Sequence, residues 1–280
     1  YATRGQWAKA KPIAQQCAAS WSATGLYLAS EICEGLAEWE ASEQCMRDLC
    51  EGYPTSAAYL WYFWCRRTGR GDVAAARKMA DTYFAAPHHE TRERAIYEGV
   101  FHLLNDDAAQ GLVAYRKALS PRPSFSCTYM VAQLARAAGD EKLRADVLST
   151  MRKASVEYAE GEDMIEPEVL ALGMAIIQLL ESGDASDERL SRLDELLGAV
   201  GALERSAYAY YVGKELEALG KQAEAEQYWR RCLQTPGHDL PAATLAGYAL
   251  AKLHGTSRPD ADALDADDLW PPLSAAQPEP

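Results

Sequence analysis

The sequence of 280 residues contains no run of about twenty apolar residues, so it predicts no membrane span. Its first residues, Tyr1 to Gly5, lack the charged, apolar and small-residue order of a secretory signal, and they lack an initiator methionine. We therefore expect a cytoplasmic chain with no membrane partner. Whether it is a fragment of a longer protein stays open at this point.

Basic residues are scarce, because 28 lysines and arginines are outnumbered by 41 aspartates and glutamates, which gives a net charge of -13. A chain without a basic face cannot release the counterions of a phosphate backbone, so we expect no nucleic acid partner. No lysine or arginine follows Arg258, whereas six acidic residues do. We interpret residues 257–280 as an acidic tail or linker, rich in proline and alanine, that is solvated rather than folded.

Motifs of enzyme chemistry are missing as well. The sequence has no G-x-S-x-G elbow, no phosphate-binding glycine loop and no C-x-x-C pair. The best metal-like cluster is His88-His89-Glu90, but it falls in a predicted loop without a second ligand pair. We therefore expect no catalysis within this chain, no metal and no cofactor.

Seven cysteines are an odd number in a chain that is too large to need disulfide staples. Cys17 and Cys232 fall at small-residue positions of predicted helices, so we expect buried free thiols there. Free thiols are typical of a reducing compartment, which again favours the cytoplasm.

The recurring feature of the sequence is a pair of amphipathic helices, most regular in residues 208–236. Small or apolar residues recur at helical spacing in each half, and Gly220 separates the halves where a helix can close in a left-handed turn. Pro236 ends the second helix. The core-facing positions are Val212, Gly213, Leu216 and Leu219 in the first helix and Ala225, Tyr228, Trp229, Cys232 and Leu233 in the second.

This stretch resembles a tetratricopeptide (TPR) repeat, a helix-turn-helix unit of about 34 residues. The family pattern orders a small residue, an apolar residue, a glycine, an alanine, an aromatic residue and a final proline. The resemblance implies an all-α fold, a right-handed superhelical solenoid of TPR-like repeats. The residues that match are Gly213, Leu216, Gly220, Ala225, Trp229 and Pro236, with the proline one place early.

The alanine position of this pattern returns along the chain with a nearly constant step. It falls at residues 10, 42, 76, 111 and 144, in steps of 32 to 35, a period that unrelated helical hairpins would not hold. From residue 144 to residue 225 the step is 81, thirteen more than two repeats of about 34. We assign the surplus to a longer acidic loop at about 155–167.

The predicted solenoid spans residues 1–256. It consists of a half repeat, about six full repeats and a C-terminal helix that caps the stack. The resemblance itself covers roughly residues 4 to 254.

In TPR proteins the first helices of successive repeats line a concave groove, and a few of their positions contact a bound peptide. The resemblance therefore implies a partner-binding row on this chain. The alternative is that its aromatic residues pack between neighbouring helices. The row consists of Tyr27, Trp61, Ile96, Val100, Tyr129, Gln133, Arg136, Tyr210 and Lys214.

Polarity changes along this row. Glu31 and Glu34 make its beginning acidic, whereas the middle around Val100 is apolar. We expect a protein or peptide partner that is apolar in its centre and basic at one end. A clamp for the acidic tails of chaperones is not expected, because such clamps use asparagine beside lysine and arginine, and Asn105 is the only asparagine in the chain.

Our interpretation is a protein-protein interaction scaffold or adaptor that is not an enzyme. The alternative is a regulatory or substrate-recruiting arm of a larger multidomain enzyme, such as a protein kinase or protease, in contact with an N-terminal domain outside this sequence. A third hypothesis is autoinhibition, in which the acidic and apolar segment 265–273 folds back on the groove.

Overall fold

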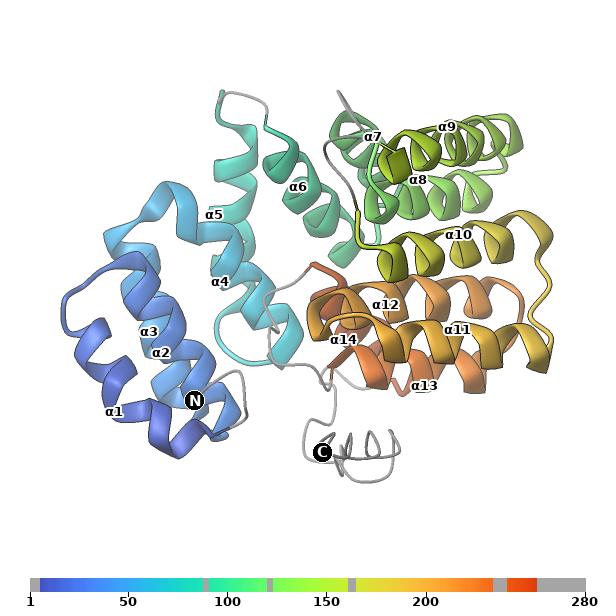
Figure 1. The fold of residues 1–280 in the computed structure, drawn as a ribbon. Coiled ribbons are helices and arrows are strands. Elements are labelled where there is room, and N and C mark those ends of the chain that lie inside the picture. The colour runs from blue at the N-terminus through green and yellow to red at the C-terminus, as the bar shows by residue number, and fades with distance from the viewer. Residues whose placement is uncertain (1–5, 88–90, 120–122, 161–164, 234–240, 256–280) are drawn as a thin grey trace, which may run out of the picture.

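The computed structural model describes residues 6–87, 91–119, 123–160, 165–233 and 241–255. These residues form fourteen α-helices and no strand, and successive helices pack against one another along most of the chain (Figure 1). The predicted all-α solenoid is therefore confirmed, whereas its handedness stays a prediction. None of the helices in these ranges is both long and apolar enough to cross a bilayer.

The helices alternate between two layers. Even-numbered helices form the inner layer and contact one another across the molecule, while odd-numbered helices make their main contacts with helices next to them in the chain. The inner helices are α2 (Ala23–Gly35), α4 (Pro54–Thr68), α6 (Arg92–Leu104), α8 (Phe125–Ala137), α10 (Pro167–Ser182), α12 (Ala202–Ala218) and α14 (Pro241–Leu253). The outer helices are α1 (Trp7–Ala18), α3 (Trp39–Gly52), α5 (Val73–Ala85), α7 (Ala108–Ala118), α9 (Glu141–Glu160), α11 (Asp187–Ala199) and α13 (Gln222–Leu233).

Short capped turns separate the paired helices. The turn between α8 and α9 closes at Gly139, whose φ of 72° is a left-handed conformation that favours glycine. The next residue, Asp140, accepts a hydrogen bond from the backbone N–H of Leu143 at 2.9 Å and so caps α9. Asp72 and Asp107 cap α5 and α7 in the same way. Local sequence therefore sets where these helices begin and end.

Paired helices approach closely at small residues. A β-carbon at Gly99 of α6 would lie 2.5 Å from the ring of Tyr115 on α7, and one at Gly213 of α12 would lie 2.7 Å from the indole of Trp229 on α13. Neither distance is compatible with a side chain. The absence of a side chain at these positions lets a large aromatic ring of the outer helix lie flat against the inner helix.

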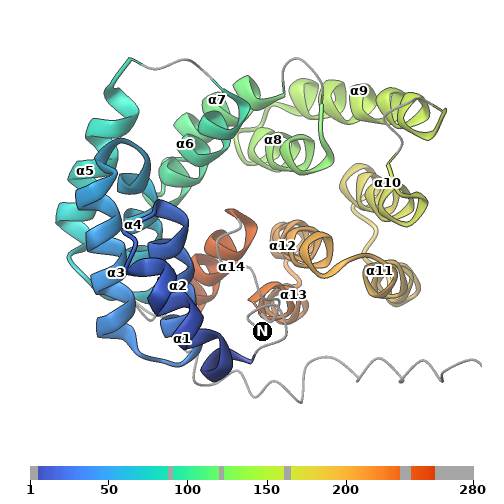
Figure 2. The same cartoon turned by 60° about the vertical axis from the view of Figure 1, so that its left-hand side comes forward.

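The C-terminal helices lie inside the curve of the N-terminal half. Helix α14 packs against α4 and α6 as well as α12 and α13 (Figure 2). The hydroxyl of Tyr248 donates to Asp106 at 2.9 Å, and Lys252 pairs with the same carboxylate at 2.8 Å. The guanidinium of Arg66 lies 5.0 Å from the centre of the Tyr248 ring. The middle of the predicted concave groove is thus occupied by helix α14 of the same chain.

Helix α9 is longer than the repeat pattern predicts. It continues to Glu160, through the first part of the segment predicted as an acidic loop. Near its end, the hydroxyl of Tyr158 donates to the carbonyl of Pro123 at 2.8 Å and ties α9 to the segment before α8. Residues 161–164 of that loop, the predicted tail at 257–280 and the cluster at 88–90 lie outside the described residues.

All seven cysteines are free. Cys232 is buried as predicted, but Cys17 is exposed, so the prediction of a buried thiol there is wrong. Their places in the stack explain the difference: α13 packs between α12 and α14, whereas α1 makes its main contact, among the described helices, with α2 alone. Burial raises the pKa of Cys65 and of Cys232 to about 12.

Thiol labelling is expected to separate these cysteines. Near neutral pH, Cys17 should react first with a small aromatic disulfide reagent, whereas Cys65 and Cys232 should stay unmodified until the chain unfolds, because a buried thiol with a raised pKa forms little thiolate. Mass spectrometry after limited reaction gives the order, and Cys17→Ser should remove the fastest phase. Labelling of Cys232 ahead of Cys17 would contradict the burial described.

Candidate interaction site

The predicted partner-binding row does not form one exposed surface. Five of its nine residues are buried and four are half-buried. The buried residues are Trp61, Val100, Tyr129, Gln133 and Tyr210, and the half-buried ones are Tyr27, Ile96, Arg136 and Lys214.

Helices α8 and α12 cover each other's part of the row. The hydroxyl of Tyr129 donates to the carbonyl of Gly173 in α10 at 2.8 Å, and its ring lies 5.4 Å from that of Tyr211. The amide of Gln133 donates to the carbonyl of Tyr211 at 2.8 Å. In this structure these side chains join three inner helices of the chain itself.

A buried ion pair completes the contact between α8 and α12. The side chain of Glu215 is wholly inaccessible to solvent and accepts a hydrogen bond from Arg136, and the guanidinium of Arg144 lies 3.9 Å away. Burial raises the pKa of Glu215, and the positive charges of the two arginines oppose that rise. Arg136 is therefore engaged in holding α8 to α12.

Other residues of the row also contact this chain. Trp61 faces the outer layer, where the guanidinium of Arg47 in α3 lies 5.1 Å from its ring centre. Ile96 packs against the hydrophobic core, and Lys214 pairs with Glu217 at 2.5 Å. Tyr27 differs from these residues because it lines a pocket of the inner layer.

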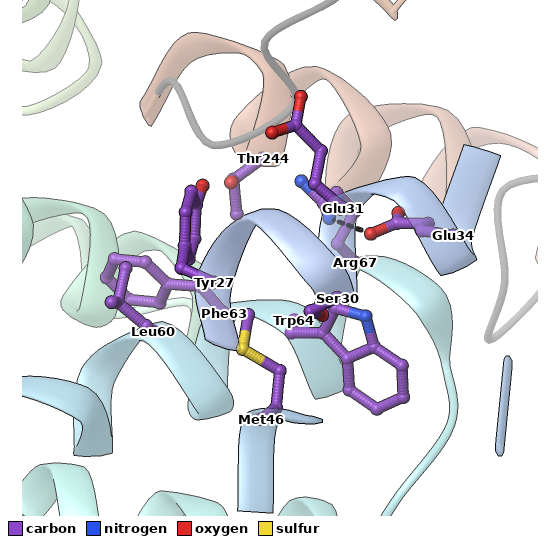
Figure 3. Close-up of a pocket in the computed structure, with 10 residues that line it drawn as sticks. All are labelled: Tyr27, Ser30, Glu31, Glu34, Met46, Leu60, Phe63, Trp64, Arg67 and Thr244. Atoms are coloured by element: carbon purple, nitrogen blue, oxygen red, sulfur yellow. Dashed lines mark hydrogen bonds and ion pairs between the residues drawn. The ribbon is translucent and has the colours of Figure 1, made fainter. Parts of the chain in front are cut away.

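This pocket lies where α2 and α4 face α14. We name it the inner pocket. Figure 3 shows the hydroxyl of Tyr27 and the carboxylate of Glu31 on the same side of the inner pocket as Thr244, opposite Met46 and Trp64. Its lining residues are Tyr27, Ser30, Glu31, Glu34, Met46, Leu60, Phe63, Trp64, Arg67 and Thr244.

One acidic residue of the inner pocket is already paired. The guanidinium of Arg67 in α4 lies 2.5 Å from the carboxylate of Glu34 in α2, and each side chain is only 12% exposed. A pair with so little exposure is screened weakly by salt, so it fixes α2 against α4. The dashed line in Figure 3 marks this contact.

Glu31 differs from Glu34 in having no such partner. It lies one helical turn earlier on α2 and is half-buried. Burial raises its pKa above the usual value of 4.5, with Arg67 opposing the rise and Glu34 adding to it. Within the described part of the chain, no hydrogen bond or ion pair reaches the carboxylate of Glu31. The positive charge that acts on Glu31, that of Arg67, is already paired with Glu34, so a further cation would be stabilised beside this partly desolvated carboxylate.

The size of the inner pocket limits what it can bind. It encloses about 20 Å³, room for a water molecule, whereas sites for small metabolites span roughly 300–1,000 Å³. The pocket can receive one cationic or apolar group beside Tyr27 and Glu31, but not a whole metabolite. Across the described ranges, no group of three or more histidine, cysteine or acidic side chains is arranged to hold a metal ion.

Sequence reasoning identified Tyr27, Glu31 and Glu34 but missed the other half of the inner pocket. Arg67 is near the end of a predicted helix and reads as a solvated basic residue. Thr244 belongs to α14, more than two hundred residues after α2. No local pattern places α14 against α4, so the pocket could be found only from the three-dimensional arrangement.

No protein-family model matches the chain, and no curated protein shows significant similarity to it.

Proposed function

We propose that the chain is a protein-binding scaffold built of TPR-like repeats, which holds a basic segment of a partner at the inner pocket. The observation that carries this proposal is Glu31, a half-buried carboxylate with no direct hydrogen bond or ion pair among the described residues, because the nearby Arg67 pairs with Glu34 instead. A lysine or arginine side chain of the partner would form a direct ion pair with Glu31. Tyr27, which lines the same pocket, offers an aromatic surface to the aliphatic stem or the cation.

The electrostatics of the whole chain support a basic partner. A net charge of -13 attracts cationic segments over several ångströms and speeds their encounter. A charge-assisted hydrogen bond to a partly buried carboxylate contributes more than an exposed one, because solvent screens it less. The proposed partner is a protein or peptide with a cationic side chain next to apolar residues.

The architecture supports the family part of the proposal. Helix pairs follow one another, with capped turns between several of them and small residues where the pairs approach closely. These are the features expected of a TPR-like repeat. Seven free cysteines fit the proposed location in a reducing cytoplasm.

A selection from a random peptide library on this chain tests the proposal. We expect selected twelve-residue peptides to share a lysine or arginine flanked by apolar residues. The charge-reversing change Glu31→Lys should weaken binding of a selected peptide about tenfold to a hundredfold, because it removes a charge-assisted contact and adds repulsion. Fluorescence anisotropy with a labelled peptide measures the change.

The matched control is Glu157→Lys, which makes the same charge change at an exposed residue of α9. It should alter binding only slightly, through the net charge. Binding should also weaken as the pH falls through the raised pKa of Glu31, because protonation removes the negative charge. Selected peptides without a basic residue, or equal effects of the two changes, would refute the proposal.

A further inference from the structure

A second and larger cavity lies away from the inner pocket, among α8, α9, α10 and α12, on the side of Figure 1 drawn from green to orange. We name it the apolar pocket. Its volume is about 540 Å³, within the range of roughly 300–1,000 Å³ that small-molecule sites occupy. Its walls are made mainly by Phe125, Met151, Ile165, Val169, Leu203 and Ala207.

Leu203 shows that the apolar pocket opens to solvent. This leucine lies in the first turn of α12, lines the cavity and is 52% exposed. An apolar wall that extends from the interior to an exposed leucine leaves hydrocarbon surface in contact with water. Covering that surface with an apolar ligand releases about 25 cal/mol for each square ångström removed from water.

Among the described residues that line the apolar pocket, two are charged, Arg92 and Glu204. Arg92 begins α6 and is half-buried, and its described contact is a long one, 4.0 Å from its guanidinium to the sulfur of Cys127. No carboxylate among the described residues pairs with it. Glu204 is exposed in the first turn of α12. A half-buried guanidinium without an acidic partner favours an anionic ligand group.

Two further polar features of the apolar pocket also favour an anionic ligand group. Tyr208 lines this cavity and is only 7% exposed, and within the described residues its hydroxyl has no hydrogen-bond partner. Helices α10 and α12 also begin at the cavity, and neither has a side-chain cap on its first N–H groups. Free N–H groups at a helix start add positive potential, part of which Glu168 in α10 and Glu204 in α12 offset.

We infer that the apolar pocket binds an amphipathic monocarboxylate of the fatty-acid class. The hydrocarbon chain would lie against the wall that ends at Leu203, and the carboxylate would accept hydrogen bonds from Arg92 and Tyr208. This site is separate from the inner pocket, and the inference stands whether or not the chain binds a basic peptide. It assigns a hydrophobic small molecule to a chain in which the inner pocket has room only for a single group.

Isothermal titration calorimetry with laurate, at concentrations below micelle formation, tests the inference on the full chain. Laurate should bind at one site and more tightly than dodecanol, which has the same number of carbon atoms and no charge. Arg92→Gln should weaken laurate binding about tenfold and leave dodecanol binding unchanged, because it removes one charge-assisted hydrogen bond. Glu204→Gln should strengthen laurate binding, since it removes a like charge.

Leu203→Gln provides the variant least expected to disturb folding, because the residue is half exposed. It should weaken the binding of both laurate and dodecanol, and circular dichroism checks that each variant keeps the wild-type melting temperature. No binding of laurate would overturn the inference. Equal affinity for laurate and dodecanol, or laurate binding that is unaffected by Arg92→Gln and Leu203→Gln, would overturn it as well.

Discussion

Replacing Glu215 with alanine is expected to lower the free energy of unfolding by about 3–5 kcal/mol, the cost of breaking a buried ion pair by removing one partner. The change would leave the guanidinium of Arg136 without its hydrogen-bond acceptor, and Arg144 would lose a carboxylate 3.9 Å away. It would also leave a void where the carboxylate meets α8. Urea denaturation followed by circular dichroism measures the loss.

Lys214→Ala is the matched control for this prediction, because it truncates the side chain of the residue that precedes Glu215 in the same helix. The pair between Lys214 and Glu217 is solvent-exposed, so its loss should change the free energy of unfolding by less than about 1 kcal/mol. Adding Arg136→Met to Glu215→Ala should restore part of the lost stability, because it removes a stranded charge. Equal effects of Glu215→Ala and Lys214→Ala would show that the buried pair does not hold α8 to α12.

Replacing Gly213 with leucine should destabilise the chain by roughly 3 kcal/mol or more, at or beyond the upper end of overpacking costs. Its first side-chain carbon alone would lie 2.7 Å from Trp229 and 3.0 Å from the carbonyl of Ala225. Because Trp229 is fully buried, it cannot move aside without opening the core between α12 and α13. Chemical denaturation again provides the measurement.

At Gly198, in contrast to Gly213, a side chain can be added without a clash. It lies in α11, and a β-carbon there would meet nothing within 4 Å. Gly198→Ala should therefore stabilise the chain by about 0.5–1 kcal/mol, because alanine loses less conformational freedom in a helix than glycine does. A neutral effect of Gly213→Leu on the free energy of unfolding would contradict the close approach of α12 and α13. A loss of stability in Gly198→Ala would contradict the open surface described at Gly198 of α11.

The helical hairpins could be predicted because their signals are local. The glycine and aspartate of the turn between α8 and α9, and the spacing of Gly213 and Trp229, are read within a few residues of each helix end. Helix lengths follow from the same signals. Only the end of α9 departs from this reading, since its last turns are held by a contact of Tyr158 with the distant Pro123.

The packing of the C-terminal helices onto the inner face could not be predicted in the same way. The repeat pattern describes contacts between neighbours, whereas Gln133 contacts Tyr211 at a separation of 78 residues. One signal was available: nearly every side chain of α8 is apolar or small, and a helix that is apolar all round is buried on all sides. Tyr129 and Gln133 were therefore better candidates for packing residues than their place in a repeat indicates.

In the inner pocket, too, some features could be predicted from local sequence and others depend on contacts between distant helices. Tyr27 and Glu31 could be assigned to the inner side of α2 from the repeat pattern. The same pattern was wrong for Trp61 of α4, which faces the outer layer. That Glu31 lacks a partner while Glu34 has one depends on the position of Arg67 on another helix. A sequence pattern constrains which face of a helix is buried, whereas the ion pair that a side chain forms depends on the distance to the neighbouring helix.

The hydrogen bond between Tyr248 and Asp106 joins residues 142 positions apart, and this has a consequence for biosynthesis. In a linear array each unit can fold as soon as its neighbour has been made. Here the inner sides of α4 and α6 stay uncovered until α14 has left the ribosome, by which time almost the whole described chain has been synthesised. We therefore expect the first half of the nascent chain to expose apolar surface for most of its synthesis and to be bound by chaperones that recognise such surfaces.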